Sequence, residues 1–560
     1  MTEPLDPITL EIIANGLRSA ADESFVALMR SAYSTNIKER RDHSTAICDA
    51  QGRLIVQAAD SLPIHIASMI GLMEHLLAKF DGDIHDGDIF VANDPHVAGG
   101  THLPDINMAT PIFHDGALAG FMCNIAHHAD IGGMVPGSMA GGMSEIFQEG
   151  LRVPVIKLFR RGDLQTDILD LLLLNVRVTE ERRGDYYAQI AACRLGAARV
   201  REMLDRYGTG VLEQAFADII SRTAKRMRLA IKSLPDGDYG FSDVMDDDGL
   251  GTVDIPIRLK VTIKGDRAKF DFTGTSPQVR GNINITYNAT QAAICYSLKA
   301  LLDPDVPNNQ GILDLPEIVA AEGSLVNAVF PAPVAARANT SQRIIDVVIG
   351  ALAKACPKAA VAAANGANTT AVFSGIDPRS GKQYVYLETL GGGFGGRATK
   401  DGRDGVQVHI TNTSNLPVEA IETEYPLFVQ SYSLVEDSGG AGQHRGGMAL
   451  RRVIGPVGHV ASFNGAGERF RNQPWGLFGG GPGGSGRFVC HKMGAKPKRL
   501  ADKPSDIDLA EGDTVAIQTP GAGGYGRPGK RSATALERDR TSGKFSTRFL
   551  KVNYGKKGGG

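Results

Sequence analysis

Five of the 13 histidines in this chain of 560 residues fall within residues 93–130, and four aspartates accompany them. Neutral imidazole nitrogens and carboxylate oxygens are the ligands that proteins offer to borderline divalent cations such as Zn²⁺ or Mn²⁺. Two imidazoles and one carboxylate leave positions open for water or substrate, and a cation held in this way lowers the pKa of water. The composition of this window therefore predicts a catalytic metal site.

The spacing within the window narrows the choice of ligands. His102 and Asp105 are three residues apart, and Pro104 stiffens the segment between them. His127 and His128 end a predicted strand, where only one of two neighbouring side chains can point to a given side. The composition does not choose between these two histidines. Histidines and aspartates of loops are also common as surface or turn residues, which is the alternative interpretation of the window.

Hydrophobic periodicity indicates the elements that position this window. It predicts helices over residues 7–33 (with Asp6 as N-cap), 66–80 and 168–207, strands over 44–56 and 88–92, and a hairpin over 112–127. Strand patterns begin at residue 253, with helices at 289–302 and 342–355 and glycine-dense loops after residue 384. This order predicts an α+β class, with a helix-rich N-terminal part that holds the metal-binding loop region and a strand- and glycine-rich C-terminal part.

Changes in composition along the chain suggest four units. We expect an N-terminal α/β metal-site domain at residues 1–232, a mixed α+β domain at 233–400, a β-rich, glycine-dense domain at 401–526 and a basic C-terminal tail at 527–560. The tail carries ten Lys and Arg against two Asp and Glu. This excess favours a solvated or disordered segment, and an arm that orders against a partner subunit is the alternative.

The overall composition argues against several classes of protein. The 60 Lys and Arg against 62 Asp and Glu give a net charge of -2, so no nucleic-acid partner is expected. No apolar run approaches the roughly 20 residues that span a bilayer, so no membrane association is expected. The six cysteines are widely spaced and no secretory signal is evident, which predicts a reduced, cytoplasmic protein. Glycine patterns beginning at Gly391 and Gly521 match a dinucleotide fingerprint only formally, because no helical segment follows either of them.

Ordered motifs run along nearly the whole chain. They read NIKERRDHSTAICDAQGRL, DSLPIHIASM, NDPHVAGGTHLPDI, AHHADIGG and NVRVTEERRGDYYAQ, then DFTGTSPQVRGNIN, LLDPDVPNNQG, RANTSQR, GGGFGGRATKDGRDG, EDSGGAGQHRGG and TPGAGGYG. Together they resemble the hydantoinase B/oxoprolinase family. This family includes large subunits of N-methylhydantoinases, caprolactamase, the C-terminal half of 5-oxoprolinase, and subunits of acetone and acetophenone carboxylases.

The resemblance implies a metal-site subunit that works beside a hydantoinase A-type, actin-like ATPase partner, in a hetero-oligomer with two copies of each subunit. The partner would use ATP and Mg²⁺ to phosphorylate a cyclic amide such as a hydantoin, 5-oxoproline or a larger lactam. Phosphorylation removes the amide resonance, and this subunit would then hydrolyse the activated amide. The family pattern of a histidine, an aspartate three residues on and a histidine 22 further falls on His102, Asp105 and His127, which implies these three as the metal ligands.

Other residues of the motifs have two interpretations each. Asp42 matches an acidic position of the family and is a candidate general base, or it forms an ion pair with Arg40 or Arg41. His128 is a candidate proton donor beside the metal, or an outward, solvated imidazole. The arginine pair at 182–183 is suited to clamp a phosphate, or it forms ion pairs on the surface of a helix.

Two other functions remain open at this point. One is ATP-dependent carboxylation of a ketone, in which the metal stabilises an enolate that attacks activated CO₂. The other is a non-catalytic scaffold for the ATPase subunit. Incorporation of labelled bicarbonate into the product separates carboxylation from hydrolysis, and stoichiometric metal in the isolated chain argues against the scaffold.

Overall fold

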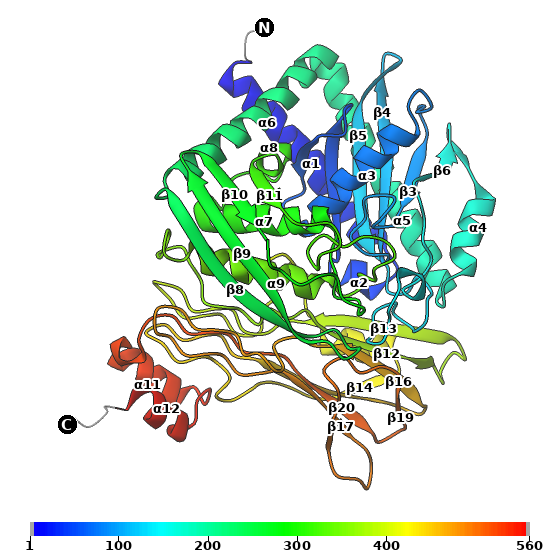
Figure 1. The fold of residues 1–560 in the computed structure, drawn as a ribbon. Coiled ribbons are helices and arrows are strands. Elements are labelled where there is room, and N and C mark those ends of the chain that lie inside the picture. Colours follow the sequence, from blue (N-terminus) through cyan, green and yellow to red (C-terminus); the bar gives the residue numbers. More distant parts are fainter. Residues whose placement is uncertain (1–4, 556–560) are drawn as a thin grey trace.

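Residues 5–555 are described by the structure, which is a computed structural model of the chain. Within them the strands form four sheets, and helices cover these sheets or separate them (Figure 1). Helix-rich and strand-rich segments follow one another along the chain, so the predicted α+β class is confirmed. The proposed domain boundaries stay a prediction.

The first sheet has seven strands in the order β2-β1-β5-β4-β3-β6-β7. Consecutive residues of its central strands are buried. Because alternate residues of a strand point to opposite sides, both faces of the sheet are covered. Ile47 and Met122 pack against helices α1 (Pro7–Ser31), α5 (Thr179–Tyr207) and α6 (Thr209–Lys232), whereas Cys48 and Phe121 pack against α3 (His65–Lys79). The strands are β1 (His43–Asp49), β2 (Leu54–Gln57), β3 (Ile89–Ala92), β4 (Asp105–His114), β5 (Ala117–His127), β6 (Ile156–Arg160) and β7 (Asp163–Leu164).

Of the helices around this sheet, α1 and α3 begin and end close to the predicted positions. The side chain of Asp6 accepts hydrogen bonds from the amides of Ile8 and Thr9 at 3.0 and 3.1 Å, so the predicted N-cap is confirmed. The helices are α1 (Pro7–Ser31), α2 (Thr35–Lys38), α3 (His65–Lys79), α4 (Thr166–Leu174), α5 (Thr179–Tyr207) and α6 (Thr209–Lys232), with a 3₁₀ turn at Ile146–Gln148.

The single helix predicted over residues 168–207 is wrong, because the structure divides it into α4 and α5. At the end of α4 the side-chain amide of Asn175 donates to the carbonyl of Leu171 at 2.8 Å. The amide of Arg177 then donates to Asp130 at 2.9 Å, which holds the backbone outside a helix. Side-chain partners for backbone groups thus end one helix and separate it from the next.

The second sheet, β11-β10-β9-β8, covers two helices that lie beside the first sheet. Strand β9 alternates buried and more exposed residues, as predicted, and its buried side faces α7 and α9. Helix α9 is buried along nearly its whole length. The elements are β8 (Gly237–Asp247), β9 (Val253–Lys264), β10 (Arg267–Asp271), β11 (Pro316–Val319), α7 (Tyr287–Leu302), α8 (Gln310–Leu313) and α9 (Arg337–Leu352).

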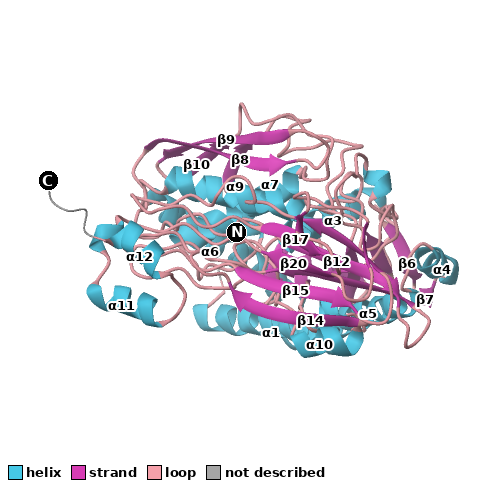
Figure 2. Ribbon diagram, turned by 90° about the horizontal axis from the view of Figure 1, so that it is seen from below, coloured by secondary structure: helices cyan, strands magenta, loops and turns pink. Residues whose placement is uncertain are grey.

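Two sheets enclose an aromatic core in the C-terminal part, with the orders β13-β12-β16-β19 and β14-β15-β20-β17-β18. Figure 2 shows β14, β15, β20 and β17 side by side at this end of the molecule. The strands are β12 (Thr369–Ile376), β13 (Gln383–Leu390), β14 (Leu427–Leu434), β15 (Leu450–Pro456), β16 (Ala461–Ala466), β17 (Arg487–His491), β18 (Lys498–Arg499), β19 (Ile507–Leu509) and β20 (Thr514–Gln518), and helix α10 is Val418–Glu424.

The glycine-dense loops pack backbone against backbone. A side-chain carbon at Gly393 would lie 2.3 Å from the carbonyl oxygen of Gly447, and one at Gly521 would lie 1.9 Å from that of Ser438. Only glycine allows so close an approach. The glycines of the two formal GxGxxG patterns therefore serve packing, as the non-helical segments after them indicate.

The basic segment after residue 526 is ordered against its own chain, so the preferred interpretation as a disordered tail is wrong for the described residues. A 3₁₀ turn (Pro528–Lys530) leads to helices α11 (Ala533–Thr541) and α12 (Thr547–Tyr554). Arg531 forms ion pairs with Asp401 and Asp539, and Phe545 is buried. Basic residues here neutralise carboxylates of the neighbouring loops, which composition alone does not reveal.

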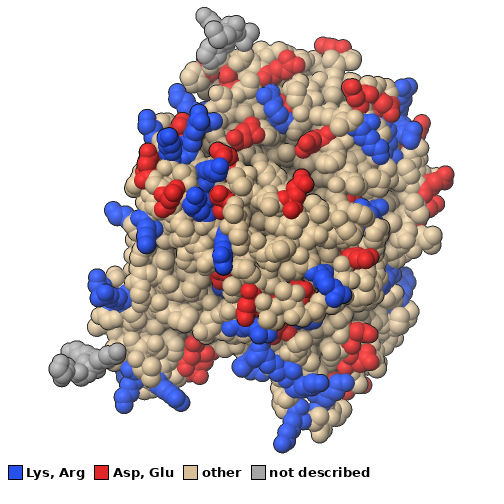
Figure 3. Space-filling model, viewed as in Figure 1, with Lys and Arg blue, Asp and Glu red and all other residues tan. Residues whose placement is uncertain are grey.

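Charged residues of both signs are interspersed on the face shown in Figure 3. Lys and Arg gather at its lower edge, where Figure 1 places β17 and the loop that follows. The exposed basic residues of that loop are Lys492, Lys496, Lys498 and Arg499. None of the helices in residues 5–555 combines the length and the apolar character that crossing a membrane requires.

Candidate metal centre

The register of the first sheet brings the three predicted ligands together. Asp105 begins β4 and His127 ends β5, and the two residues are directly opposite in the antiparallel pair. His102 lies in the turn before β4. Nε2 of His102 is 2.9 Å from Oδ1 of Asp105, and Nδ1 of His127 is 3.1 Å from the same oxygen. One ligand atom from each residue lies within 4.8 Å of the others, and all three side chains are buried.

The hydrogen bonds of His102 leave a lone pair that faces a carboxylate. Nδ1 of His102 is 3.0 Å from the carbonyl oxygen of Ala335, so this nitrogen carries the proton of the neutral ring. Nε2 is then an acceptor, and it faces Oδ1 of Asp105 without a hydrogen bond. Nε2 of His127 is also buried without a partner. Buried acceptors that face one another repel unless a cation lies between them, so these residues fit a divalent metal ion.

A buried arginine compensates the charge of Asp105. Arg337, the first residue of α9, places Nη2 2.5 Å from Oδ2 of Asp105. Burial opposes the charge of this carboxylate, but the neighbouring basic groups, with Arg337 among them, outweigh that effect and hold the pKa of Asp105 well below its usual range. Burial, together with Arg337, lowers the pKa of His102 to about 4. At neutral pH the site thus offers a neutral imidazole and an ionised carboxylate, which are the forms that bind metal.

Two further residues of this site, His65 and Arg337, are not among the ligands or bases that the sequence predicts. Nε2 of His65 lies 3.7 Å from Oδ2 of Asp105 and 3.8 Å from Oδ1 of Asp42, and its Nδ1 is 2.9 Å from the hydroxyl of Ser44. The signal was present, because His65 lies in DSLPIHIASM and Arg337 in RANTSQR, which both carry the family resemblance. Their spacing along the chain does not indicate the site, because His65 begins α3 and Arg337 begins α9, far in sequence from the three candidate ligands.

A cavity of about 20 Å³ is lined by two of the three candidate ligands, His102 and His127. This volume is room for one water molecule. The cavity lies between the first sheet and the pair β12–β13. Asp42 lines this cavity, and its Oδ2 is 3.8 Å from Nη2 of Arg40, whereas Arg41 pairs with Asp60. The other lining residues are Leu62, Ile64, His65, His102, His127, Met139, Arg337, Ala338, Asn368, Leu387, Thr389, Thr411 and Thr413.

His128 lies apart from this group. Its Nε2 is 2.9 Å from the side-chain oxygen of Gln189, and its ring is 4.8 Å from that of Tyr186, both on α5. His128 is buried, so the outward, solvated alternative is wrong. Its role as a proton donor stays a prediction. Of the arginine pair, Arg182 is buried and lies 3.2 Å from Asp185 of the same helix, and neither arginine lines the cavity.

The burial of His43, the first residue of β1, predicts that the free energy of unfolding depends on pH. Burial lowers the pKa of His43 to about 4, although the carbonyl of Phe25 and the charge of Asp42 oppose this. The unfolded chain, with an ordinary histidine pKa of about 6.5, binds this proton first as the pH falls. His43 therefore removes up to about 1.4 kcal/mol of unfolding free energy per pH unit between about pH 6.5 and 4.

Replacing His43→Gln should flatten this part of the profile. Urea unfolding of the wild type and the variant at several pH values measures the difference in slope. Parallel profiles over this range would show that folding leaves the pKa of His43 unchanged.

Comparisons of the sequence and of the fold relate this chain to known proteins. The model of the family described as hydantoinase B/oxoprolinase matches residues 6–528. 5-oxoprolinase 1 of Arabidopsis thaliana is 34% identical over 93% of this chain, which spans 42% of that relative. The caprolactamase subunit beta of Pseudomonas jessenii is 31% identical over 98% of this chain and 96% of its own length.

Solved structures show the same fold. The crystal structure of the ATP-dependent caprolactamase from Pseudomonas jessenii matches with a TM-score of 0.92 at 29% identity, over 99% of this chain and 96% of that one. A nucleotide-free acetone carboxylase also matches with a TM-score of 0.92, at 21% identity over 98% of this chain and 79% of that one, and this likeness concerns the fold alone. With its sequence matched almost from end to end and its fold shared with caprolactamase, the chain belongs to the hydantoinase B/oxoprolinase family.

Proposed function

We propose that this chain is the metal-site subunit of a heteromeric, ATP-dependent cyclic-amide hydrolase. The observation that carries the proposal is the buried group of His102, Asp105 and His127, in which an imidazole lone pair faces a carboxylate oxygen at 2.9 Å. Family relatives are named caprolactamase and 5-oxoprolinase, which supports a hydantoin, 5-oxoproline or a larger lactam as substrate. We propose Zn²⁺ or Mn²⁺ as the cation.

Each residue of the site would have a separate role in the reaction. His102, Asp105 and His127 hold a cation that, when bound, polarises a carbonyl group and lowers the pKa of water. Asp42, on the wall of the same cavity, accepts the proton that water gives up. Arg337 compensates the charge of Asp105 and keeps the carboxylate oriented. The buried surroundings limit the entry of bulk water.

A partner subunit would supply the nucleotide chemistry. A relative named as a subunit beta supports a heteromer. We propose a hydantoinase A-type, actin-like ATPase that uses ATP and Mg²⁺ to phosphorylate the amide oxygen, in a cytoplasmic complex with two copies of each subunit. Phosphorylation removes the amide resonance and supplies a leaving group, so the hydrolytic site here acts on an activated carbon.

Removal of the divalent cation should abolish ATP-dependent ring opening by the complex, because the site then lacks its source of activated water. Zn²⁺ or Mn²⁺ should restore it. Elemental analysis of the purified chain, followed by chromatography of the ring-opened product before and after chelation, measures both effects. Full turnover by a metal-depleted complex would contradict the proposal, and labelled bicarbonate in the product would identify ketone carboxylation instead.

A further inference from the structure

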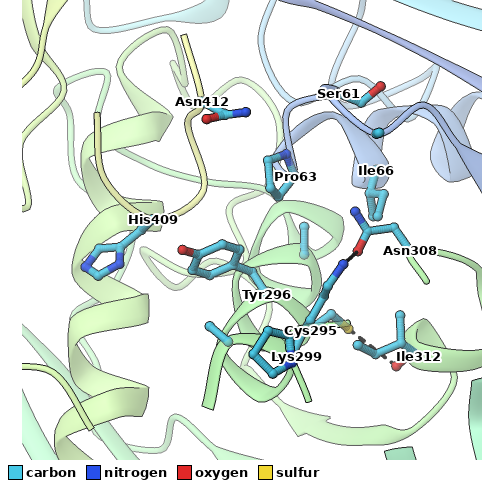
Figure 4. A pocket seen from close by; sticks show the side chains of 14 residues that line it. Ser61, Pro63, Ile66, Cys295, Tyr296, Lys299, Asn308, Ile312, His409 and Asn412 are labelled. Atoms are coloured by element: carbon cyan, nitrogen blue, oxygen red, sulfur yellow. Dashed lines mark hydrogen bonds between the residues drawn. The ribbon is translucent and has the colours of Figure 1, made fainter. Parts of the chain in front are cut away.

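A second cavity, of about 360 Å³, is called the outer cavity here, and Figure 4 shows the side chains that line it. The small cavity beside His102 and His127 is the inner cavity. The volume of the outer cavity lies in the range of small-molecule sites, whereas the inner cavity has room for one water molecule only. A substrate ring therefore fits the outer cavity and does not fit the inner one. The outer cavity lies between α7, the segment before α3 and the loop that contains His409.

The two cavities share one wall. The first segment of this wall is residues 61–65. Leu62, Ile64 and His65 line the inner cavity, and Ser61 and Pro63 line the outer one. The second segment is residues 409–413. Thr411 and Thr413 line the inner cavity, and His409 and Asn412 line the outer one. The amide of Ile64 donates to the carbonyl of Ile410 at 3.2 Å, which joins the two segments. The outer cavity is thus the space next to the hydrolytic site.

Two hydrogen-bond donors from α7 line the outer cavity. Lys299 donates to the side-chain oxygen of Asn308 at 2.9 Å, and among residues 5–555 no carboxylate pairs with its ammonium group. The nearby Asp303 is bound by Arg226 at 2.5 Å. Burial lowers the pKa of Lys299 against the opposing charges of the neighbouring aspartates. An ammonium group that no described carboxylate contacts, in a half-buried cavity, is available to pair with an anion.

The second donor is the hydroxyl of Tyr296, to which no other described residue offers a hydrogen bond. Burial raises the pKa of Tyr296 to about 12, so this group is a neutral phenol. Figure 4 shows the Tyr296 ring between His409 and the Lys299 side chain. Apolar groups of Pro63, Ile66 and Ile312 supply another part of the lining. The cavity therefore offers a cation and a phenol to one end of a ligand and hydrocarbon to the rest.

We propose that the outer cavity binds the cyclic-amide substrate, and that this substrate carries a carboxylate that pairs with Lys299 and accepts a hydrogen bond from Tyr296. The inference rests on the proposed function, since it names the substrate class of the same reaction. 5-oxoproline, a five-membered lactam with a carboxylate, is the matching probe. Pyrrolidin-2-one is the same ring without the carboxylate.

Calorimetric titration of the full chain with these two compounds tests the proposal. We expect 5-oxoproline to bind at least about 10-fold more tightly than pyrrolidin-2-one, because a hydrogen-bonded charge pair contributes about 1.5–3 kcal/mol. Lys299→Gln should weaken 5-oxoproline binding by about 10–100-fold and leave pyrrolidin-2-one unchanged. Tyr296→Phe should weaken it by about 2–10-fold, as loss of one neutral hydrogen bond does. Lys358→Gln, on the surface, is the matched control and should bind as the wild type does.

Equal binding of the two lactams to the wild type, no binding of either, or unchanged 5-oxoproline affinity in Lys299→Gln would each overturn the inference. Failure of the proposed function has a different signature. Binding of 5-oxoproline that depends on Lys299, together with no ATP-dependent turnover by the complete complex, would contradict the hydrolase while leaving a carboxylate site in place.

Discussion

Replacing His102→Ala is expected to abolish ring opening by the complex with the proposed ATPase partner. The substitution removes the nitrogen that faces Oδ1 of Asp105 at 2.9 Å and leaves only two of the three candidate ligands. Loss of a Lewis acid removes several kcal/mol of transition-state stabilisation, which corresponds to a fall in turnover of about 10³-fold or more. The measurement is product formed per complex under saturating ATP, with the metal content determined on the same samples.

A second histidine-to-alanine variant distinguishes loss of a metal ligand from a general effect of removing a histidine side chain. His114, also in the histidine-rich window, ends β4 at the opposite end from Asp105, and its Nδ1 is 2.9 Å from the hydroxyl of Thr209. His114→Ala should therefore retain both metal and turnover. Association with the ATPase subunit should persist in both variants, since neither side chain is exposed. A His102→Ala complex that keeps its metal and its activity would remove the proposed function.

The sequence predicted those residues of the candidate site that lie close together along the chain. His102, Asp105 and His127 lie within 26 residues of one another, and His102 stands in the turn before a hairpin whose register the alternation of side chains specifies. The family pattern then chose His127 over His128, and the structure places the side chain of His128 against α5. Local order along this segment, together with the family pattern, thus identified the candidate ligands.

The rest of the site depends on contacts between distant segments, which no local pattern encodes. Arg337 reaches Asp105 across 232 positions of sequence. The outer cavity exists because the segment before α3 meets the loop at residue 410 through one backbone hydrogen bond. The C-terminal helices were missed for a related reason: the carboxylates that neutralise their basic residues, such as Asp401 for Arg531, come from loops more than 100 residues earlier.

Replacing Arg337→Met is expected to destabilise the metal-free chain by about 3–5 kcal/mol, because it leaves the buried carboxylate of Asp105 without its principal counter-charge. Nη2 of Arg337 is 2.5 Å from this carboxylate, and its Nε donates to the hydroxyl of Thr101 at 2.9 Å, so two buried partners lose a donor. The midpoint of urea unfolding measures the change. Arg222→Met, at an exposed ion pair with Glu11, should change stability by less than about 0.5 kcal/mol.

Metal links this stability effect to the proposed chemistry. A divalent cation bound beside Asp105 supplies positive charge at the place where Arg337 has been removed, so saturating Zn²⁺ or Mn²⁺ should recover part of the lost stability in Arg337→Met. Ligands that bind only the folded state raise its stability by mass action in any variant, so the informative quantity is the extra gain of Arg337→Met over Arg222→Met. An equal gain in the two variants would show that the cation and Arg337 act on different charges, and that Asp105 does not bind the metal.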